Sequence, residues 1–123
     1  MSLPLALIIE DDPKLAHIFG EALRAAEFET EIIKEGDSAL ARLAVTIPAV
    51  VVLDLHLPEV SGETILHQIR ADERLTGTSV MIATADPYLA ETLRSQADLV
   101  LIKPISFGQL RDLAKRLRPA DQL

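Results

Sequence analysis

The stretch VVVLDLHLPEVSG (residues 50–62) places one carboxylate, Asp54, directly after the apolar run Val50–Leu53. Three β-branched residues followed by leucine favour a buried β-strand. Such a strand excludes an unpaired charge, because a buried lone carboxylate is strongly unfavourable. Asp54 therefore belongs where the strand leaves the core, and Pro58 and Gly62 favour a turn soon after it. The end of this strand is the first place to look for function.

The composition limits the class of protein. The chain has 123 residues, 49% of them apolar, which suits one domain with a real core. The net charge of −7 argues against a nucleic-acid surface. The absence of cysteine excludes disulfides and fits a reducing compartment. No apolar run approaches the roughly 20 residues of a membrane span, and the N-terminus lacks the basic start of a signal peptide. We expect a cytoplasmic domain.

Apolar periodicity predicts five strands that alternate with five helices. The predicted strands are Leu5–Ile9, Glu29–Lys34, Ala49–Leu53, Ser79–Thr84 and Leu99–Ile102. The predicted helices begin at Pro13, span Ser38–Ala44, Gly62–Arg70 and Pro87–Ser95, and begin after a Ser106–Gln109 capping box. Because the strands are continuous apolar runs, we expect an α/β fold with a doubly wound parallel sheet. We assign residues 1–119 to one domain and expect residues 120–123 to fray or to begin a linker.

Polar residues follow four of the five predicted strands. They are Glu10, Asp11 and Asp12 after the first strand, Asp54 after the third, Thr84 at the end of the fourth, and Lys103 after the fifth. In an open parallel sheet, ligands bind beyond the carboxyl ends of the strands. If the first strand lies beside the third, the acids and the lysine share one pocket.

Such a pocket suits phosphoryl chemistry. Clustered carboxylates need a counter-charge, and Mg²⁺ prefers oxygen ligands while keeping several waters. A carboxylate can attack phosphorus and form an acyl phosphate. A metal ion and Lys103 would neutralise the oxygens of the transferred group, and the Thr84 hydroxyl would donate a hydrogen bond to it.

Four motifs together resemble the receiver domain of two-component response regulators, over nearly the whole chain. They are LIIEDD (7–12), VVLDLHLPEVSG (51–62), IATA (82–85) and LIKP (101–104). Each motif is weak alone, but this order at these strand ends is highly specific. The resemblance implies a CheY-like, flavodoxin-like (βα)5 fold with strand order 2-1-3-4-5.

The resemblance also implies roles for the acids. Asp54 would be the phosphoacceptor and one ligand of Mg²⁺. Glu10 and Asp11 would be the acidic pair that holds the metal, with Asp11 a direct ligand, and the backbone carbonyl of His56 would complete the shell. Asp12 is better interpreted as a helix N-cap, because a proline follows it.

Thr84 would be the switch hydroxyl and Lys103 the phosphate contact. The resemblance further implies that the Lys103–Pro104 peptide is cis, and that Pro58 and Gly62 belong to the loop that turns back into the third helix.

The chain departs from the family pattern at several positions. An aromatic residue often lies three positions before the lysine, where this chain has Val100, so Tyr88 or Phe107 would have to contribute to a different switch. Because the predicted fourth helix is short, we do not infer the family's usual dimer from the resemblance. His56 and Asp86 lie where family members tune hydrolysis of the acyl phosphate.

We expect a phosphorylation-controlled receiver that is not otherwise an enzyme. A histidine kinase or a histidine phosphotransfer protein would be the donor and a protein the effector, with no direct binding of nucleic acid or membrane. The first alternative is a pseudo-receiver that acts without phosphorylation. The second is a small phosphatase, although such enzymes carry an acid two residues after the nucleophile, where this chain has His56.

Other polar residues have ordinary interpretations. The three histidines show no metal-ligand spacing; they are His17, His56 and His67. A basic stripe on the last helix favours a solvated face, with partner docking as the alternative; it comprises Arg111, Lys115, Arg116 and Arg118.

Overall fold

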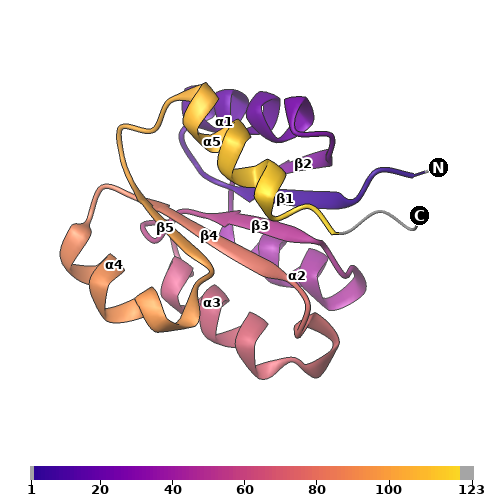
Figure 1. Cartoon of the computed structure of the whole chain (residues 1–123). Coiled ribbons are helices and arrows are strands. Elements are labelled where there is room, and N and C mark those ends of the chain that lie inside the picture. The colour runs from indigo at the N-terminus through magenta and orange to yellow at the C-terminus, as the bar shows by residue number, and fades with distance from the viewer. Residues whose placement is uncertain (1, 120–123) are drawn as a thin grey trace.

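The computed structural model of the chain describes residues 2–119 and contains one parallel five-stranded sheet (Figure 1). The strands are β1 (Leu5–Ile9), β2 (Glu29–Ile33), β3 (Val50–Leu53), β4 (Ser79–Thr84) and β5 (Leu99–Ile102). Their order is β2-β1-β3-β4-β5, and every neighbouring pair is parallel. The predicted α/β class and strand order are confirmed. The expected tail at 120–123 lies outside the described residues, and the domain boundary at 119 stays a prediction.

Five helices connect and follow the strands. They are α1 (Pro13–Ala25), α2 (Gly36–Val45), α3 (Gly62–Ala71), α4 (Pro87–Leu93) and α5 (Phe107–Arg116), with short 3₁₀ turns η1 (Glu73–Leu75) and η2 (Arg94–Gln96). Within residues 2–119, no helix combines the length and the apolar character needed to cross a membrane.

The helices cover both faces of the sheet. Figure 1 shows α1 and α5 on one face and α2, α3 and α4 on the other. Side chains alternate along each strand, so Ala6 and Ile8 pack toward α1 and α5 while Leu7 and Ile9 pack toward α2 and α3. Two apolar cores result, and the strands between them are continuously apolar because both faces are buried.

Two helices differ from the predicted spans by two residues at one end, whereas α3 ends one residue later than predicted, at Ala71. Helix α2 begins at Gly36, two residues before the predicted Ser38, and extended Glu35 occupies the N-cap position without a side-chain hydrogen bond. Without a capping side chain, the sequence carried no start signal there. Helix α4 ends at Leu93, and the predicted last residues form the tighter turn η2 instead.

Capping side chains fix where the other helices start. Asp12 accepts hydrogen bonds from the N–H groups of Lys14 and Leu15 at 2.9 and 3.2 Å, which confirms its predicted N-cap role. Ser106 accepts from the Gln109 N–H at 3.0 Å. Such caps satisfy N–H groups that have no partner inside the helix.

Arg70, near the end of α3, forms hydrogen bonds to groups at the starts of two strands, at the end of the sheet opposite the strand carboxyl ends. Its guanidinium donates to the carbonyls of Gln96 and Thr78 at 2.7 and 3.0 Å and to Asp98 Oδ2 at 2.9 Å. The same Asp98 oxygen accepts from the Val80 N–H at 2.7 Å. One side chain therefore joins α3 to the starts of β4 and β5.

We predict that Arg70→Met lowers the free energy of unfolding by about 1–3 kcal/mol, because it leaves two carbonyls and a carboxylate without a charged donor. Urea unfolding measures the change. The control is Arg94→Met, which removes only an exposed ion pair with Glu91 and should shift stability by less than about 0.5 kcal/mol. Equal effects of the two substitutions would contradict a structural role for Arg70.

Candidate functional site

The register of the sheet brings the predicted site residues together. Ile9 pairs with Leu53, so Glu10 and Asp54 leave neighbouring strands side by side. The Asp54 N–H donates to the Ile9 carbonyl at 3.0 Å, which continues the ladder one residue further. On the other side, Thr84 pairs with Ile102, and the Lys103 N–H donates to the Thr84 carbonyl at 2.8 Å.

Glu10, Asp11 and Asp54 form one acidic cluster. Each offers a carboxylate oxygen, and the three oxygens lie within 4.8 Å of one another. Glu10 and Asp54 are buried, with 1% and 5% of their surface exposed, whereas Asp11 is exposed. Buried carboxylates at this spacing repel one another, so the cluster needs positive charge.

Lys103 supplies part of that charge. Its Nζ lies 2.8 Å from Glu10 Oε1 and 3.6 Å from Asp54 Oδ1, and 17% of its side chain is exposed. The Lys103–Pro104 peptide is cis, as predicted. The ammonium group thus bridges the two buried carboxylates from the end of β5.

Burial raises the pKa of the Glu10 carboxyl above its ordinary value, and the negative charge of Asp54 raises it further. The hydrogen bond from Lys103 and the one from the Asp12 N–H, at 3.2 Å, act in the opposite direction. Lys103 and the Asp12 N–H therefore do not fully offset the effect of burial on Glu10.

Thr84 is fully buried at the end of β4. Its Oγ1 accepts a hydrogen bond from the Asp86 N–H at 3.1 Å. An accepting hydroxyl keeps its own proton available for donation. Thr84 therefore keeps one hydroxyl proton at the end of the strand next to β3.

The loop between β3 and α3 holds Asp54 through close backbone contacts. A side chain at Gly62 would collide with the Asp54 carbonyl oxygen and come within 2.6 Å of Leu55 Cα, so only glycine fits. Glu59 has a φ of 67°, and the Val60 N–H donates to the Pro58 carbonyl at 2.7 Å in a tight turn. The His56 N–H donates to Asp54 Oδ1 at 3.2 Å. This loop fixes one oxygen of the carboxylate.

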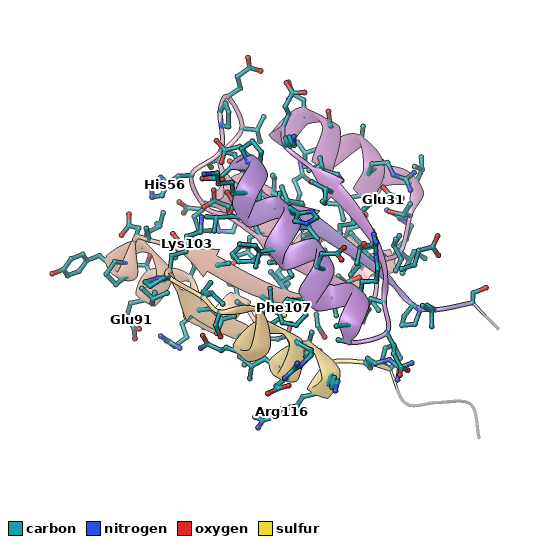
Figure 2. All side chains as sticks on the ribbon, turned by 90° about the horizontal axis from the view of Figure 1, so that it is seen from above. Glu31, His56, Glu91, Lys103, Phe107 and Arg116 are labelled. Atoms are coloured by element: carbon teal, nitrogen blue, oxygen red, sulfur yellow. The ribbon has the colours of Figure 1, made fainter. Side chains whose placement is uncertain are left out.

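One contact at the site was not predicted from sequence. His56 Nε2 lies 3.2 Å from Asp86 Oδ2, which joins the loop after β3 to the loop after β4. Figure 2 shows His56 on the outer edge of the molecule, beyond Lys103. Asp86 also caps α4, and the hydrogen bond from Leu89 is the largest cause of its lowered pKa. The Asp86-Pro87 pair repeats the cap signal of Asp12-Pro13, so this cap was recognisable.

The cluster fits a divalent metal ion. Within residues 2–119 it brings together three acids against one lysine, with two carboxylates buried and one facing solvent. Oxygen donors with a solvent-facing side are the donor set that Mg²⁺ prefers, because this ion keeps part of its water shell.

The comparison with protein families is decisive for the fold and the class of protein. A family model described as the response regulator receiver domain matches residues 6–115. The chain belongs to the response-regulator receiver family. This receiver domain therefore comes from the proteins of two-component signalling, as its four motifs predicted.

Similar proteins agree. The receiver domain is 32% identical over 126 residues to the transcriptional regulatory protein BaeR of Escherichia coli O6:H1, covering 98% of this chain and 52% of BaeR. A CheY-like receiver structure from Methylobacillus flagellatus has a TM-score of 0.84 at 27% identity, covering 95% of this chain and all of that one. The chain spans about half the length of BaeR and of several other curated relatives.

A third neighbour is the receiver domain of a sensor histidine kinase, PA1611, from Pseudomonas aeruginosa PAO1. That structure holds a magnesium ion in its active-site cleft, and it matches with a TM-score of 0.83, covering 94% of this chain and 98% of that one. At 20% identity the likeness shows the shared fold alone.

We predict that Lys103→Met, in metal-free buffer, lowers the free energy of unfolding at pH 7 by roughly 3 kcal/mol, because two buried carboxylates lose their shared cation. It should also raise the pKa of Glu10 further. A carboxyl whose folded pKa is raised stabilises the fold when protonated, so the deficit should shrink as the pH falls through that pKa.

Urea unfolding between pH 4 and pH 8 checks this, with Lys115→Met on the exposed face of α5 as control. A deficit that stays constant over this range would show that Lys103 does not neutralise Glu10.

Proposed function

We propose that this receiver domain accepts a phosphoryl group on Asp54 from a phosphohistidine, in a Mg²⁺-dependent reaction, and thereby switches a surface that binds a downstream protein. The donor would be a histidine kinase or a histidine phosphotransfer protein. The observation that carries the proposal is the buried Asp54 carboxylate, which lies 3.6 Å from the Lys103 ammonium and within 4.8 Å of carboxylate oxygens of Glu10 and Asp11. Cytoplasmic location, and the lack of direct contact with nucleic acid or membrane, stay predictions.

The geometry favours one oxygen of Asp54 as the nucleophile. Among the described residues, the partners of this carboxylate are the His56 N–H and Lys103, and both contact Oδ1. We assign Oδ2 as the attacking oxygen. It forms the new O–P bond while the N–P bond of the phosphohistidine breaks, and the departing imidazole keeps the bonding electron pair and takes up a proton.

Glu10, Asp11 and Asp54, with the His56 carbonyl, would hold Mg²⁺. When bound, this ion supplies positive charge to the oxygens of the group in transfer. The chain's own residues do the remaining work. Lys103 can follow the transferred group, because its ammonium already lies within 3.6 Å of Asp54, and Thr84 can donate its proton to a phosphoryl oxygen.

The phosphoryl group of the product would carry about two negative charges. It would replace the single charge of the Asp54 carboxylate, so the site would gain about one negative charge. Two groups at the same edge of the sheet can respond to that charge. They are the Lys103 ammonium, which pairs with Glu10 and lies 3.6 Å from Asp54, and the buried Thr84 hydroxyl at the end of β4. Phosphorylation can shift an equilibrium between two conformations only by the difference in free energy between the contacts that the phosphoryl group makes in each.

We predict that the domain, incubated with Mg²⁺ and acetyl phosphate, gains the mass of one phosphoryl group. Asp54→Asn should gain none, because an amide oxygen is a much poorer nucleophile than a carboxylate. Intact-protein mass spectrometry measures this, with EDTA as the second control.

Stoichiometric modification of the Asn variant would place the phosphoacceptor elsewhere. If the unaltered domain gains no mass and also fails to bind beryllofluoride, the result would favour a module that acts without phosphorylation.

A second prediction concerns the metal. Asp11→Asn should weaken Mg²⁺ binding by at least about tenfold, since loss of even an outer partner of a metal ligand costs that much. Asp12→Asn is the matched control: it removes the same charge one residue away but keeps a capping oxygen for α1. Amide chemical shifts around Glu10, followed during a Mg²⁺ titration, give both affinities. An equal loss in the two variants would indicate general electrostatics instead of a ligand at Asp11.

A further inference from the structure

Three of the hydrogen-bonding contacts of Asp86 connect different parts of the molecule. Its N–H donates to Thr84 Oγ1 at 3.1 Å, its Oδ1 accepts from the Leu89 N–H at 3.0 Å, and its Oδ2 lies 3.2 Å from His56 Nε2. The first contact reaches the hydroxyl of the site, the second begins helix α4, and the third reaches the loop that carries Asp54. This one residue therefore touches the site, its flanking loop and a surface helix.

The chain has few other ways to carry a change from Thr84 outward. It contains four aromatic residues. Phe19 and Phe28 are buried in the core cluster under α1 and α5, Phe107 begins α5 and lies under the Arg111 guanidinium, and Tyr88 is 85% exposed. The position three residues before Lys103 holds the smaller, partly buried Val100. Hydrogen bonds are thus the connection that the structure provides.

Helix α4 is well placed to respond at its start. It has seven residues and buries only Ala90 and Leu93. Asp86 provides its side-chain cap, and Pro87 follows directly. A helix of this length has little stability of its own, so its first turn depends strongly on one capping carboxylate.

We propose that Asp86 is a positioning residue that transmits phosphorylation of Asp54 to the first turn of α4. The proposal rests on the proposed function. When Thr84 moves to donate to the phosphoryl group, the Asp86 N–H must follow its acceptor or lose it. Either change displaces the carboxylate that caps α4 and holds His56, so the cap loosens and the surface around Tyr88 is altered.

The chain carries its own probe for this change. Tyr88 is the single tyrosine, the chain has no tryptophan, and this residue lies in the first turn of α4, two positions after Asp86. Its fluorescence therefore reports on α4 without a label. Hydrogen exchange of the Leu89 amide, which donates to Asp86, reports on the cap itself.

The experiment adds beryllofluoride and Mg²⁺ to the full chain and to three variants, with ¹⁹F NMR to count bound beryllofluoride. Asp86→Ala removes the cap and the His56 contact, whereas Asp86→Asn keeps a capping oxygen and a polar group that reaches His56. The matched control is Asp72→Ala. Asp72 also caps a turn, through the Arg74 N–H, and pairs through its other oxygen, with the Arg74 guanidinium.

We expect beryllofluoride to speed exchange of the Leu89 amide in the unaltered chain by about fivefold, the factor that corresponds to the ~1 kcal/mol of one helix cap, and to change Tyr88 fluorescence. Asp86→Ala should bind beryllofluoride but show neither response, with Leu89 exchanging fast throughout. Asp86→Asn and Asp72→Ala should respond like the unaltered chain. If Asp86 had only a structural role as a cap, Asp86→Ala would still show the Tyr88 response to beryllofluoride.

Two results would overturn the proposal. One is an unaltered chain that binds beryllofluoride without any change at Leu89 and Tyr88. The other is Asp86→Ala with a full Tyr88 response. An unaltered chain that binds no beryllofluoride would instead overturn the proposed function, and with it the role of Asp86.

Discussion

The contact between the Lys103 ammonium and the Glu10 carboxylate is the interaction on which the site depends. Two buried acids at the ends of neighbouring strands repel each other, and the lysine at 2.8 Å from one and 3.6 Å from the other makes their burial tolerable. The offset is incomplete, because the pKa of Glu10 remains raised. Three carboxylates against one ammonium group leave a site that suits a bound cation.

The parallel sheet makes this arrangement possible at little structural cost. Each acid or hydroxyl directly follows or ends a strand whose other residues are buried and apolar, as Asp54 follows Val50–Leu53. The core remains apolar on both faces, and the polar groups share one edge. The Arg70 contacts lie at the starts of β4 and β5, away from this edge. Arg70 therefore stabilises the start of the sheet without contacting the residues of the site.

Most of the fold and of the candidate site could be predicted from the sequence, because the site residues directly follow strands that have a strong apolar pattern. Continuous apolar runs located the strands, and the capping residues Asp12 and Ser106 marked the starts of α1 and α5. The start of α2 was missed because Glu35 makes no side-chain cap for it. The contact between His56 and Asp86 could not be predicted, since the two residues are 30 positions apart and meet only because β3 and β4 are neighbours. Periodicity locates elements, whereas such contacts need the register of the sheet.

The small size of α4 bears on how such a domain can diverge. Two side chains of the helix are buried, Ala90 and Leu93. The outward-facing side chains of α4 therefore do not pack in the core. Substitutions there leave both cores intact and are close to neutral for stability. The outward face of α4 can therefore vary with little effect on folding, whereas the residues at the strand ends each make several contacts that a substitution would break.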